Sequence, residues 1–395
     1  MKKVWDKWTR IALVKRILVG LILGAVLGIA VPQATGIAIL GDVFVSALKA
    51  IAPLLVFFLV VSSLCNAGKS HGGVIKTVII LYMFSTVLAA VIAVFASMAF
   101  PVKMTLANAA TDTSAPQGIV EVLNNLLLNV VANPVSSLVN ANYVGILMWA
   151  VLLGLAFRAA DKMTKKVLAD VADGISMVVT WIINLAPFGI FGLVFNTVST
   201  NGLDIFTTYG KLLILLVGCM LFIYFVTNPL LVYWCIRQNP YPLIFHCLKR
   251  SALTAFFTRS SAANIPVNMK VCEEMGLDRD TYSVTIPLGA TINMDGAAIT
   301  ITVMTMATAF TLGIHVDIPT AIILSLLAAL SACGASGVAG GSLLLIPMAC
   351  SLFGISDDIS MQVVAVGFII GVVQDSVETA LNSSSDLLLS ASAEF

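Results

Sequence analysis

The sequence predicts an all-α membrane protein that crosses the bilayer several times. Hydrophobic residues make up 59% of the 395 residues and charged residues only 10%, whereas charged residues are about a quarter of an average soluble domain. Apolar stretches of membrane-spanning length recur along the chain, which has room for roughly eight spans. This composition excludes a soluble globule. The basic residues form no compact patch of the kind that binds nucleic acid.

The apolar stretches follow one another with charged residues between them. A long charged N-terminus precedes the first stretch, which begins near Ile11 and is long enough to be a retained helix and not a cleaved signal peptide. We expect the other simple spans at residues 43 to 65, 77 to 101, 143 to 157, 167 to 199, 211 to 236, 281 to 313 and 361 to 391.

Two further apolar regions carry a polar interruption in the middle. Residues 242 to 270 contain TRSSAANIP, and residues 318 to 354 contain GASGVAGGS. Irregular backbone inside a bilayer must be buried in protein or line a watery cavity. We therefore predict two re-entrant helical hairpins, arranged as paired broken segments of an inverted repeat. The alternative is two ordinary helix pairs joined by polar turns at the membrane surface.

The basic residues predict the orientation in the membrane. With a cytoplasmic N-terminus and regular alternation, 18 of the 21 lysines and arginines fall on the cytoplasmic side, as the positive-inside rule requires. The other side receives only Lys49, Lys103 and Lys211. This topology also requires the first interrupted region to enter and leave by the cytoplasmic side.

The stretch from 281 to 313 contains residues that break a helix. Pro287, Gly289 and the run Asn293-Met294-Asp295-Gly296 lie midway along it. A helix broken there exposes main-chain oxygens beside a carboxylate and an amide. Such hard oxygen ligands suit an alkali cation, and the anions are too few for a tight divalent site. A structural kink is the alternative.

The last apolar stretch has one polar face. Positions i, i+3, i+4, i+7 and i+11 of a helix share a stripe, and here they are Asp375, Glu378, Thr379, Asn382 and Asp386. After Arg279 the chain has no further lysine or arginine to neutralise these acids. Buried acids at membrane depth cost on the order of 3 kcal/mol each and mark a transported species, a partner or a cavity. The pattern predicts that cations come from outside the protein.

In this order, TRSSAANIP, NMDG, a Gly/Ser-rich tip and D-x-x-E-T-x-x-N-x-x-x-D closely resemble the dicarboxylate/amino acid:cation symporter family. The resemblance spans essentially the whole chain. It implies an elevator-type transporter of eight transmembrane helices and two re-entrant hairpins, in which residues 1–240 are mainly scaffold and trimerisation helices and 241–395 are the core of the transport domain. The third helix, within 1–240, joins the transport domain. It also implies a homotrimer embedded in the lipid of a bacterial inner membrane.

The resemblance also assigns roles to residues. It implies that Asp375 accepts the ammonium of an amino acid and that Asn382 donates to its α-carboxylate, with Thr379 beside them. The two hairpin tips would complete the substrate site and form a lid, through Ser260, Ser261 and Val338 to Gly340.

Three sodium sites follow from the same resemblance, with Na⁺ as the co-transported ion. The first would use main-chain oxygens of Gly289, Asn293 and Asn382 with the Asp386 carboxylate. The second would combine Asn293 and Asp295 with third-helix residues, and the third would combine Thr291 with the second tip. The third-helix residues are Tyr82, Ser85 and Thr86.

Two departures from the family pattern bear on the substrate. Members that carry acidic substrates have an arginine where this chain has Glu378, and a threonine often stands where it has Ala297. A glutamate repels a second carboxylate but accepts a hydrogen bond from a hydroxyl. Arg259 could neutralise Glu378 or Asp375. We expect a small neutral substrate, serine or threonine above all, as in the bacterial sodium:serine/threonine symporters that the chain resembles most.

Other functions stay open at this point. Within the same fold, proton coupling or an acidic substrate is the alternative, and a channel is the alternative from another class. An enzyme is not expected, because Val338 interrupts the G-x-S-x-G pattern that begins at Gly334, and the chain has only three histidines. Seven cysteines without C-x-x-C spacing indicate packing residues and no metal site.

Overall fold

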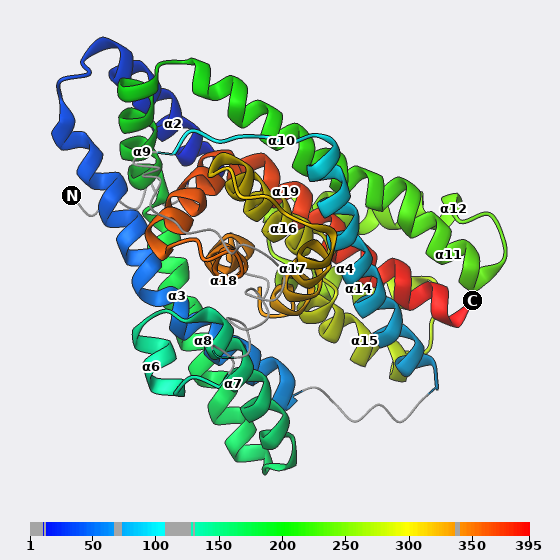
Figure 1. Ribbon diagram of the computed structural model, residues 1–395. Coiled ribbons are helices and arrows are strands. Elements are labelled where there is room, and N and C mark those ends of the chain that lie inside the picture. Colours follow the sequence, from blue (N-terminus) through cyan, green and yellow to red (C-terminus); the bar gives the residue numbers. More distant parts are fainter. Residues whose placement is uncertain (1–10, 12, 67–72, 107–127, 129–130, 336–339) are drawn as a thin grey trace.

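The computed structural model describes residues 11, 13–66, 73–106, 128, 131–335 and 340–395, and these residues form helices and no strand. The α-helices, with short 3₁₀ or π segments between some of them, are α2 (Leu13–Ala30), α3 (Ala38–Asn66), α4 (Gly73–Ala99), α6 (Pro134–Val139), α7 (Tyr143–Ala156), α8 (Lys162–Asn184), α9 (Ala186–Asn201), α10 (Asp204–Phe222), α11 (Asn228–Ile236), α12 (Tyr241–Cys247), α13 (Leu253–Thr258), α14 (Ser261–Glu274), α15 (Arg279–Ile292), α16 (Asp295–Thr311), α17 (Ile318–Ala332), α18 (Ile346–Ser351) and α19 (Asp357–Glu394). The prediction of an all-helical membrane protein is confirmed (Figure 1).

Six helical segments of the described chain are long and apolar enough to cross a membrane. They are Thr35–Asn66, Gly73–Ala99, Lys162–Asn184, Phe206–Ile236, Arg279–Thr311 and Asp357–Glu394. The stretch expected from 143 to 157 forms α7, which has only 14 residues. The count of eight spans therefore stays a prediction.

The sequence predicted one span from 167 to 199, and this prediction is wrong for the helices, because the stretch forms two. It is divided at Leu185 into α8 and α9. Pro187 has no N–H to donate to the preceding turn, and the Leu185 N–H bonds to Ile182 O in a tighter turn. Asn184 is the one polar residue next to this division, too little to interrupt the apolar stretch in a hydropathy pattern.

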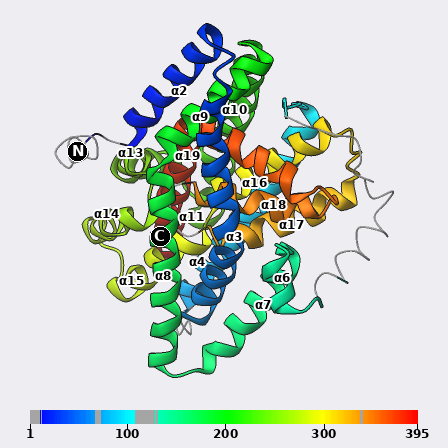
Figure 2. The same ribbon diagram turned by 90° about the vertical axis from the view of Figure 1, so that its left-hand side faces the viewer.

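The helices pack in two groups. In the first, α3 contacts α7, α8 and α9, and α2 lies along α9. Figure 2 shows α3 and α8 as long helices side by side on one face of the molecule. The second group contains α4 and the helices from α10 onward. The groups meet where α3 and α9 contact α19.

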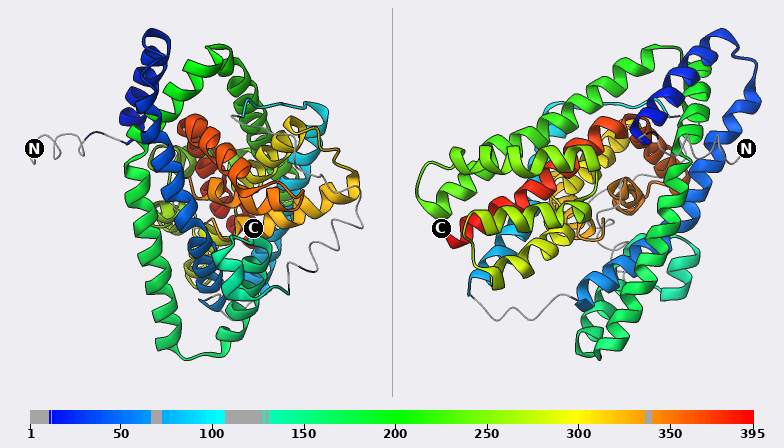
Figure 3. Two further views of the ribbon diagram at one scale, coloured as in Figure 1. Left: turned by 60° about the vertical axis from the view of Figure 1, so that its left-hand side comes forward. Right: turned by 180° about the vertical axis from the view of Figure 1, so that it is seen from behind.

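Helix α19 is the centre of the second group. It contacts α4, α10, α11, α13, α14, α15, α16 and α18, and most of its side chains are buried, the polar ones included. Figure 3 shows it running through the molecule to the C-terminus, with α10 and α11 on one side. A helix surrounded on all sides needs polar partners for each polar residue it carries.

The first interrupted region forms a helix–turn–helix hairpin. Helices α12 and α13, joined by the π-helical segment Leu248–Ala252, descend to a turn at Arg259 and Ser260, and α14 returns. Both arms contact α19. Arg259 and Ser261 at the turn are buried. Thr258 and Ala262, which flank them, are exposed, so the choice between a re-entrant hairpin and a turn at the membrane surface stays a prediction.

The second interrupted region has the same plan. Helix α17 runs to Ala332, and a 3₁₀ segment, Gly341–Leu345, leads into α18. Residues 336–339, which include Val338, lie outside the described residues. The described side of this tip is buried against α16 and α19.

The predicted break at NMDG is confirmed. Helix α15 ends at Ile292, and α16 begins at Asp295. Asn293 and Met294 have non-helical dihedral angles, with ψ values of 80° and 51°. Because all four residues from Asn293 to Gly296 are buried, the backbone groups freed by the break face protein and not lipid.

The contact between α2 and α9 depends on small residues. A Cβ atom on Gly20 would lie 2.2 Å from Pro187 O, and one on Gly24 would lie 2.6 Å from Phe191 O. Gly28 follows at the same spacing of four, against Phe195 O at 3.0 Å. This G-x-x-x-G-x-x-x-G stripe lets the two backbones approach closely, which is how membrane helices gain packing energy.

We expect Gly24→Leu to separate α2 from α9. Overpacking against a backbone carbonyl costs roughly 1 to 3 kcal/mol, so the apparent Tm in detergent should fall by several degrees. Gly174→Leu is the matched control, because a Cβ on Gly174 of α8 meets nothing within 4 Å. Equal Tm values for the two variants would contradict the proposed contact.

Candidate functional site

Polar residues from both hairpins and α19 meet around one small space, with Met294 from the break between α15 and α16 beside them. Its lining includes Arg259 and Ser261 from the first tip, Ser342 from the second, and Asp375, Glu378 and Asn382 from α19. The space has a volume of about 10 Å³, close to the size needed for a single water molecule. An amino acid can enter only if a hairpin tip moves.

Arg259 pairs with Asp375 across this space. Its Nε lies 2.7 Å from Asp375 Oδ2, and both side chains are buried. Arg259 is the last residue of the first arm and has φ +52°, an uncommon conformation for a residue other than glycine. The second tip reaches the same carboxylate, because Gly340 N–H donates to Asp375 Oδ1 at 3.2 Å. Asp375 thus holds both tips.

Glu378 is fixed by one of its two carboxylate oxygens. Oε2 accepts hydrogen bonds from Thr300 Oγ1 at 2.7 Å, Ser342 Oγ at 2.9 Å and Gln374 Nε2. No described residue donates to Oε1, and Glu378 lines the small space. Three donors on one oxygen orient the side chain and leave the second oxygen as a free acceptor.

The other predicted substrate residues lie around the same space or at its edge. Asn382 Oδ1 accepts from Gly296 N–H at 2.7 Å, and Thr379 Oγ1 donates to Asp375 O at 2.8 Å within α19. Ser261 lines the space. Ser260 accepts from Ala263 N–H as the N-cap of α14, so one of its roles is structural. Val338 is among the residues outside the described chain.

A second cluster surrounds Asp386 one turn further along α19. Asn293 Nδ2 donates to Asp386 Oδ1 at 2.9 Å and approaches Asn382 O at 3.5 Å. Gly289 packs so closely that a Cβ would lie 2.7 Å from Asp386 Oδ1. The buried atoms Asn293 Oδ1 and Asp386 Oδ2 have no hydrogen-bond partner among the residues that the structure describes. Two orphaned buried oxygens beside main-chain oxygens are the donor set an alkali cation requires.

A third cluster surrounds Asp295 at the start of α16. Its carboxylate accepts from Ser85 Oγ at 2.7 Å and from Thr86 Oγ1 at 3.2 Å, both on α4. The structure places Tyr82 elsewhere: its hydroxyl donates to Asp386 O at 2.9 Å and also contacts Ser390 Oγ. The five residues expected to surround one ion are therefore divided between two neighbouring clusters, with Asn293 and Tyr82 at Asp386 and with Ser85 and Thr86 at Asp295.

Thr291 lies at the end of α15, where its hydroxyl donates to Leu288 O at 2.8 Å. Cys333, just before the second tip, approaches Ile292 O at 3.7 Å. A site formed by Thr291 and this tip stays a prediction, because residues 336–339 lie outside the described residues. Within the described residues, no group of three His, Cys, Asp or Glu side chains is placed to hold a metal ion, so hard, mostly neutral oxygens dominate these clusters.

Sequence reasoning missed the residues that hold Glu378. Gln374 lies four residues before it on the same stripe of α19, so helical spacing could have identified it. Thr300 stands in an apolar run of α16 and gave no signal. The main-chain N–H of Gly296, which binds Asn382, became available only through the break in the helix.

The buried polar site, the broken helix and the two hairpins define a polytopic membrane transporter, not an enzyme. The chain belongs to the sodium:dicarboxylate symporter family, whose sequence model matches residues 13–394. It is 58% identical to the serine/threonine transporter SstT of Bifidobacterium adolescentis, over all of this chain and 92% of the relative. It is 55% identical to the serine/threonine transporter SstT of Streptococcus thermophilus, over all of this chain and 98% of that relative.

We expect Gly340→Ala to loosen the second tip. Gly340 has φ +73°, and a Cβ there would lie 2.9 Å from Phe368 Cε1. Strained backbone of this kind costs on the order of 1 to 3 kcal/mol, so deuterium exchange in peptides covering 340–346 should accelerate at least fivefold. Gly371→Ala on α19 is the control, since its Cβ meets nothing within 4 Å. Unchanged exchange in Gly340→Ala would show that this close contact does not hold the tip.

Proposed function

We propose that the chain is a sodium-coupled symporter that imports serine and threonine by alternating access. The observation that carries the proposal is the position of Glu378, which lines the same small space as Asp375 and Asn382 and whose Oε2 alone accepts the hydrogen bonds of the described residues. The family and the two named transporters support it.

The site offers one partner for each polar group of a hydroxy amino acid. Asp375 is the acceptor for the ammonium, and the Asn382 amide with the tip residues is the donor set for the α-carboxylate. The hydroxyl donates to Glu378 Oε1. A substrate with a second carboxylate would meet Glu378 instead of a cation, and a buried pair of like charges is strongly unfavourable. The geometry therefore favours serine and threonine over dicarboxylates.

Asn382 connects substrate binding to ion binding. Its side chain lines the substrate space, and its main-chain oxygen lies beside the Asn293 amide in the Asp386 cluster. A sodium ion between Asn293 Oδ1 and Asp386 Oδ2 would supply the partner that both oxygens lack. It would also fix the backbone of the break and of Asn382. Binding at one site would thus raise the affinity of the other, which is the requirement for coupled transport.

We assign the scaffold to residues 1–240 apart from the third helix, and the core of the transport domain to 241–395. The packing supports a division of this kind, because α2, α3, α7, α8 and α9 contact one another while α4 packs on α15, α16 and α19. Helices α10 and α11 also pack on α19, so they are the part of the scaffold that adjoins the transport domain. The scaffold would form a homotrimer in the lipid of a bacterial inner membrane, with the N-terminus cytoplasmic and the hairpins re-entrant, and the transport domain would move as an elevator.

Uptake of radiolabelled serine into proteoliposomes tests the proposal when sodium and proton gradients are imposed separately. Accumulation that requires the sodium gradient and saturates with serine supports a sodium symporter. Accumulation driven by the pH gradient alone would assign a proton-coupled carrier. Flux that dissipates a gradient without saturation would assign a channel.

We expect Asp386→Asn and Asp295→Asn each to raise the sodium concentration for half-maximal uptake by roughly tenfold or more, because removing a buried anionic ligand costs ~1.4 kcal/mol or more. The measurement is initial serine uptake against external sodium. Asp161→Asn is the matched control, since Asp161 is an exposed N-cap of α8 and asparagine caps equally well. Parent-like sodium dependence in both buried variants would remove these acids from the ion sites.

We expect Glu378→Arg to weaken serine uptake and to make aspartate a competitor, because a guanidinium binds a side-chain carboxylate in a bidentate manner. Glu378→Gln is the control that removes the charge and keeps the shape. It should allow much less aspartate binding than Glu378→Arg. The readout is competition of labelled serine by excess aspartate, with expression matched. Strong competition by aspartate in the parent protein would refute Glu378 as the selectivity residue.

A further inference from the structure

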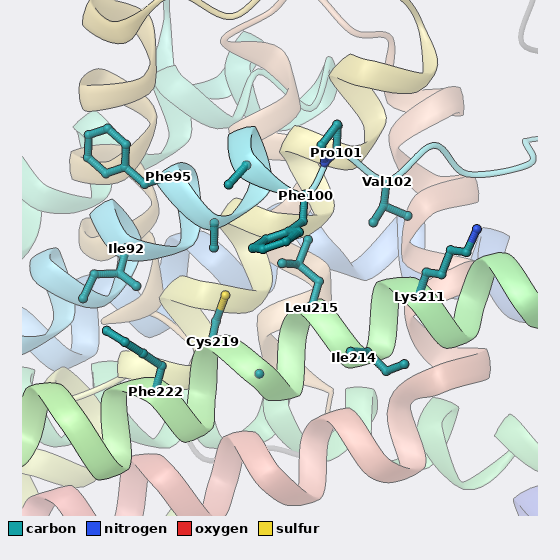
Figure 4. Close-up of a pocket in the computed structure, with 13 residues that line it drawn as sticks. Ile92, Phe95, Phe100, Pro101, Val102, Lys211, Ile214, Leu215, Cys219 and Phe222 are labelled. Carbon is teal, nitrogen blue, oxygen red and sulfur yellow. The ribbon is translucent and has the colours of Figure 1, made fainter.

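A large apolar groove lies between α4 and α10, away from the substrate and ion clusters. It has a volume of about 840 Å³ and is lined by Ile92, Phe95 and Phe100 on the α4 side and by Ile214, Leu215 and Phe222 on α10. Several of these side chains are exposed, Ile214 to 74% and Phe100 to 68%. Figure 4 shows the two sets of side chains facing the groove.

One end of the groove is basic. Lys211 lines it there, and Figure 4 shows its ammonium group at the end where Pro101 and Val102 lie. Lys103 follows Val102 and is exposed. No hydrogen bond or ion pair joins either lysine to the residues that the structure describes. Met104 N–H donates to Thr311 Oγ1 at 2.8 Å, which anchors this segment to the end of α16 and fixes the rim of the groove.

The dimensions fit a lipid chain. The helix from Lys211 to Phe222 rises by roughly 16 Å, which is about the depth of one leaflet of a hydrocarbon core ~30 Å thick. A chain lying in the groove would cover the exposed aromatic side chains. Its headgroup would reach the level of Lys211 and Lys103.

We propose that this groove binds one phospholipid with an anionic headgroup from the surrounding bilayer. The acyl chain fills the space between α4 and α10, and the headgroup phosphate pairs with Lys211 and Lys103. Two unpaired ammonium groups above an apolar groove select for net negative charge. A zwitterionic lipid carries a compensating cation at the same level and gains less.

The experiment uses the full-length protein, reconstituted in vesicles with equal phosphatidylglycerol and phosphatidylcholine and then extracted in mild detergent. Native mass spectrometry counts the retained lipids. The parent should retain phosphatidylglycerol over phosphatidylcholine by at least three- to fivefold. Lys211→Gln should lower this ratio, and the double variant with Lys103→Gln should bring it close to one. Gly218→Leu should lower total retention, because a Cβ on Gly218 meets nothing within 4 Å and the new side chain enters the groove.

Gly210→Leu is the matched control on α10, since its Cβ also has open space but Gly210 does not line the groove; it should retain lipid as the parent does. Equal retention of both lipids by the parent would overturn the proposal. Undiminished retention of phosphatidylglycerol in Gly218→Leu would also overturn it. A change in subunit number when the groove is filled would instead assign the surface to a second copy of the chain.

A measurement without variants gives a second test. Added phosphatidylglycerol should raise the Tm of the delipidated parent more than phosphatidylcholine does, and equal shifts would also overturn the proposal.

Discussion

The C-terminal half of this protein is organised by four buried carboxylates, of which only Asp375 forms an ion pair within the described residues, with the buried Arg259. Asp295, Asp375, Glu378 and Asp386 are each at most 5% exposed. Among the described residues, Arg259 is the one cation that forms an ion pair with any of them. A buried anion without compensation is strongly unfavourable. Each remaining acid must therefore be satisfied by neutral donors or by a cation from outside the chain.

The irregular backbone supplies many of these partners. The turn of the first hairpin provides Arg259, the second tip provides Gly340 N–H and Ser342, and the break between α15 and α16 provides Gly296 N–H and the Asn293 amide. Regular helices would have used the same main-chain groups internally. The hairpins and the break thus supply the donors without which acids could not be buried inside an apolar protein. This explains why they all converge on α19.

The polar features of the fold were predictable from the sequence, and the packing was not. The stripe from Asp375 to Asp386 and the break at Asn293 have local signatures, namely helical spacing and helix-breaking residues, and the structure has both. The division at Leu185 has a local cause in Pro187, which a hydropathy pattern does not register. The place of Tyr82 depends on contacts between distant helices, so a single sequence does not show it. The role of Thr300 could not be predicted either, because the hydroxyl of a threonine in an apolar helix usually bonds to a main-chain carbonyl of the same helix. Its partner, Glu378, lies 78 residues away.

The ion pair between Arg259 and Asp375 sets the electrostatics of this site. The carboxylate already has a cation, and the space beside it is about the size of one water molecule. If Asp375 binds the substrate ammonium as proposed, the ammonium would replace a guanidinium, one positive charge for another. The local charge around Asp375 would then be the same before and after, and the protein would never have to bury that acid alone.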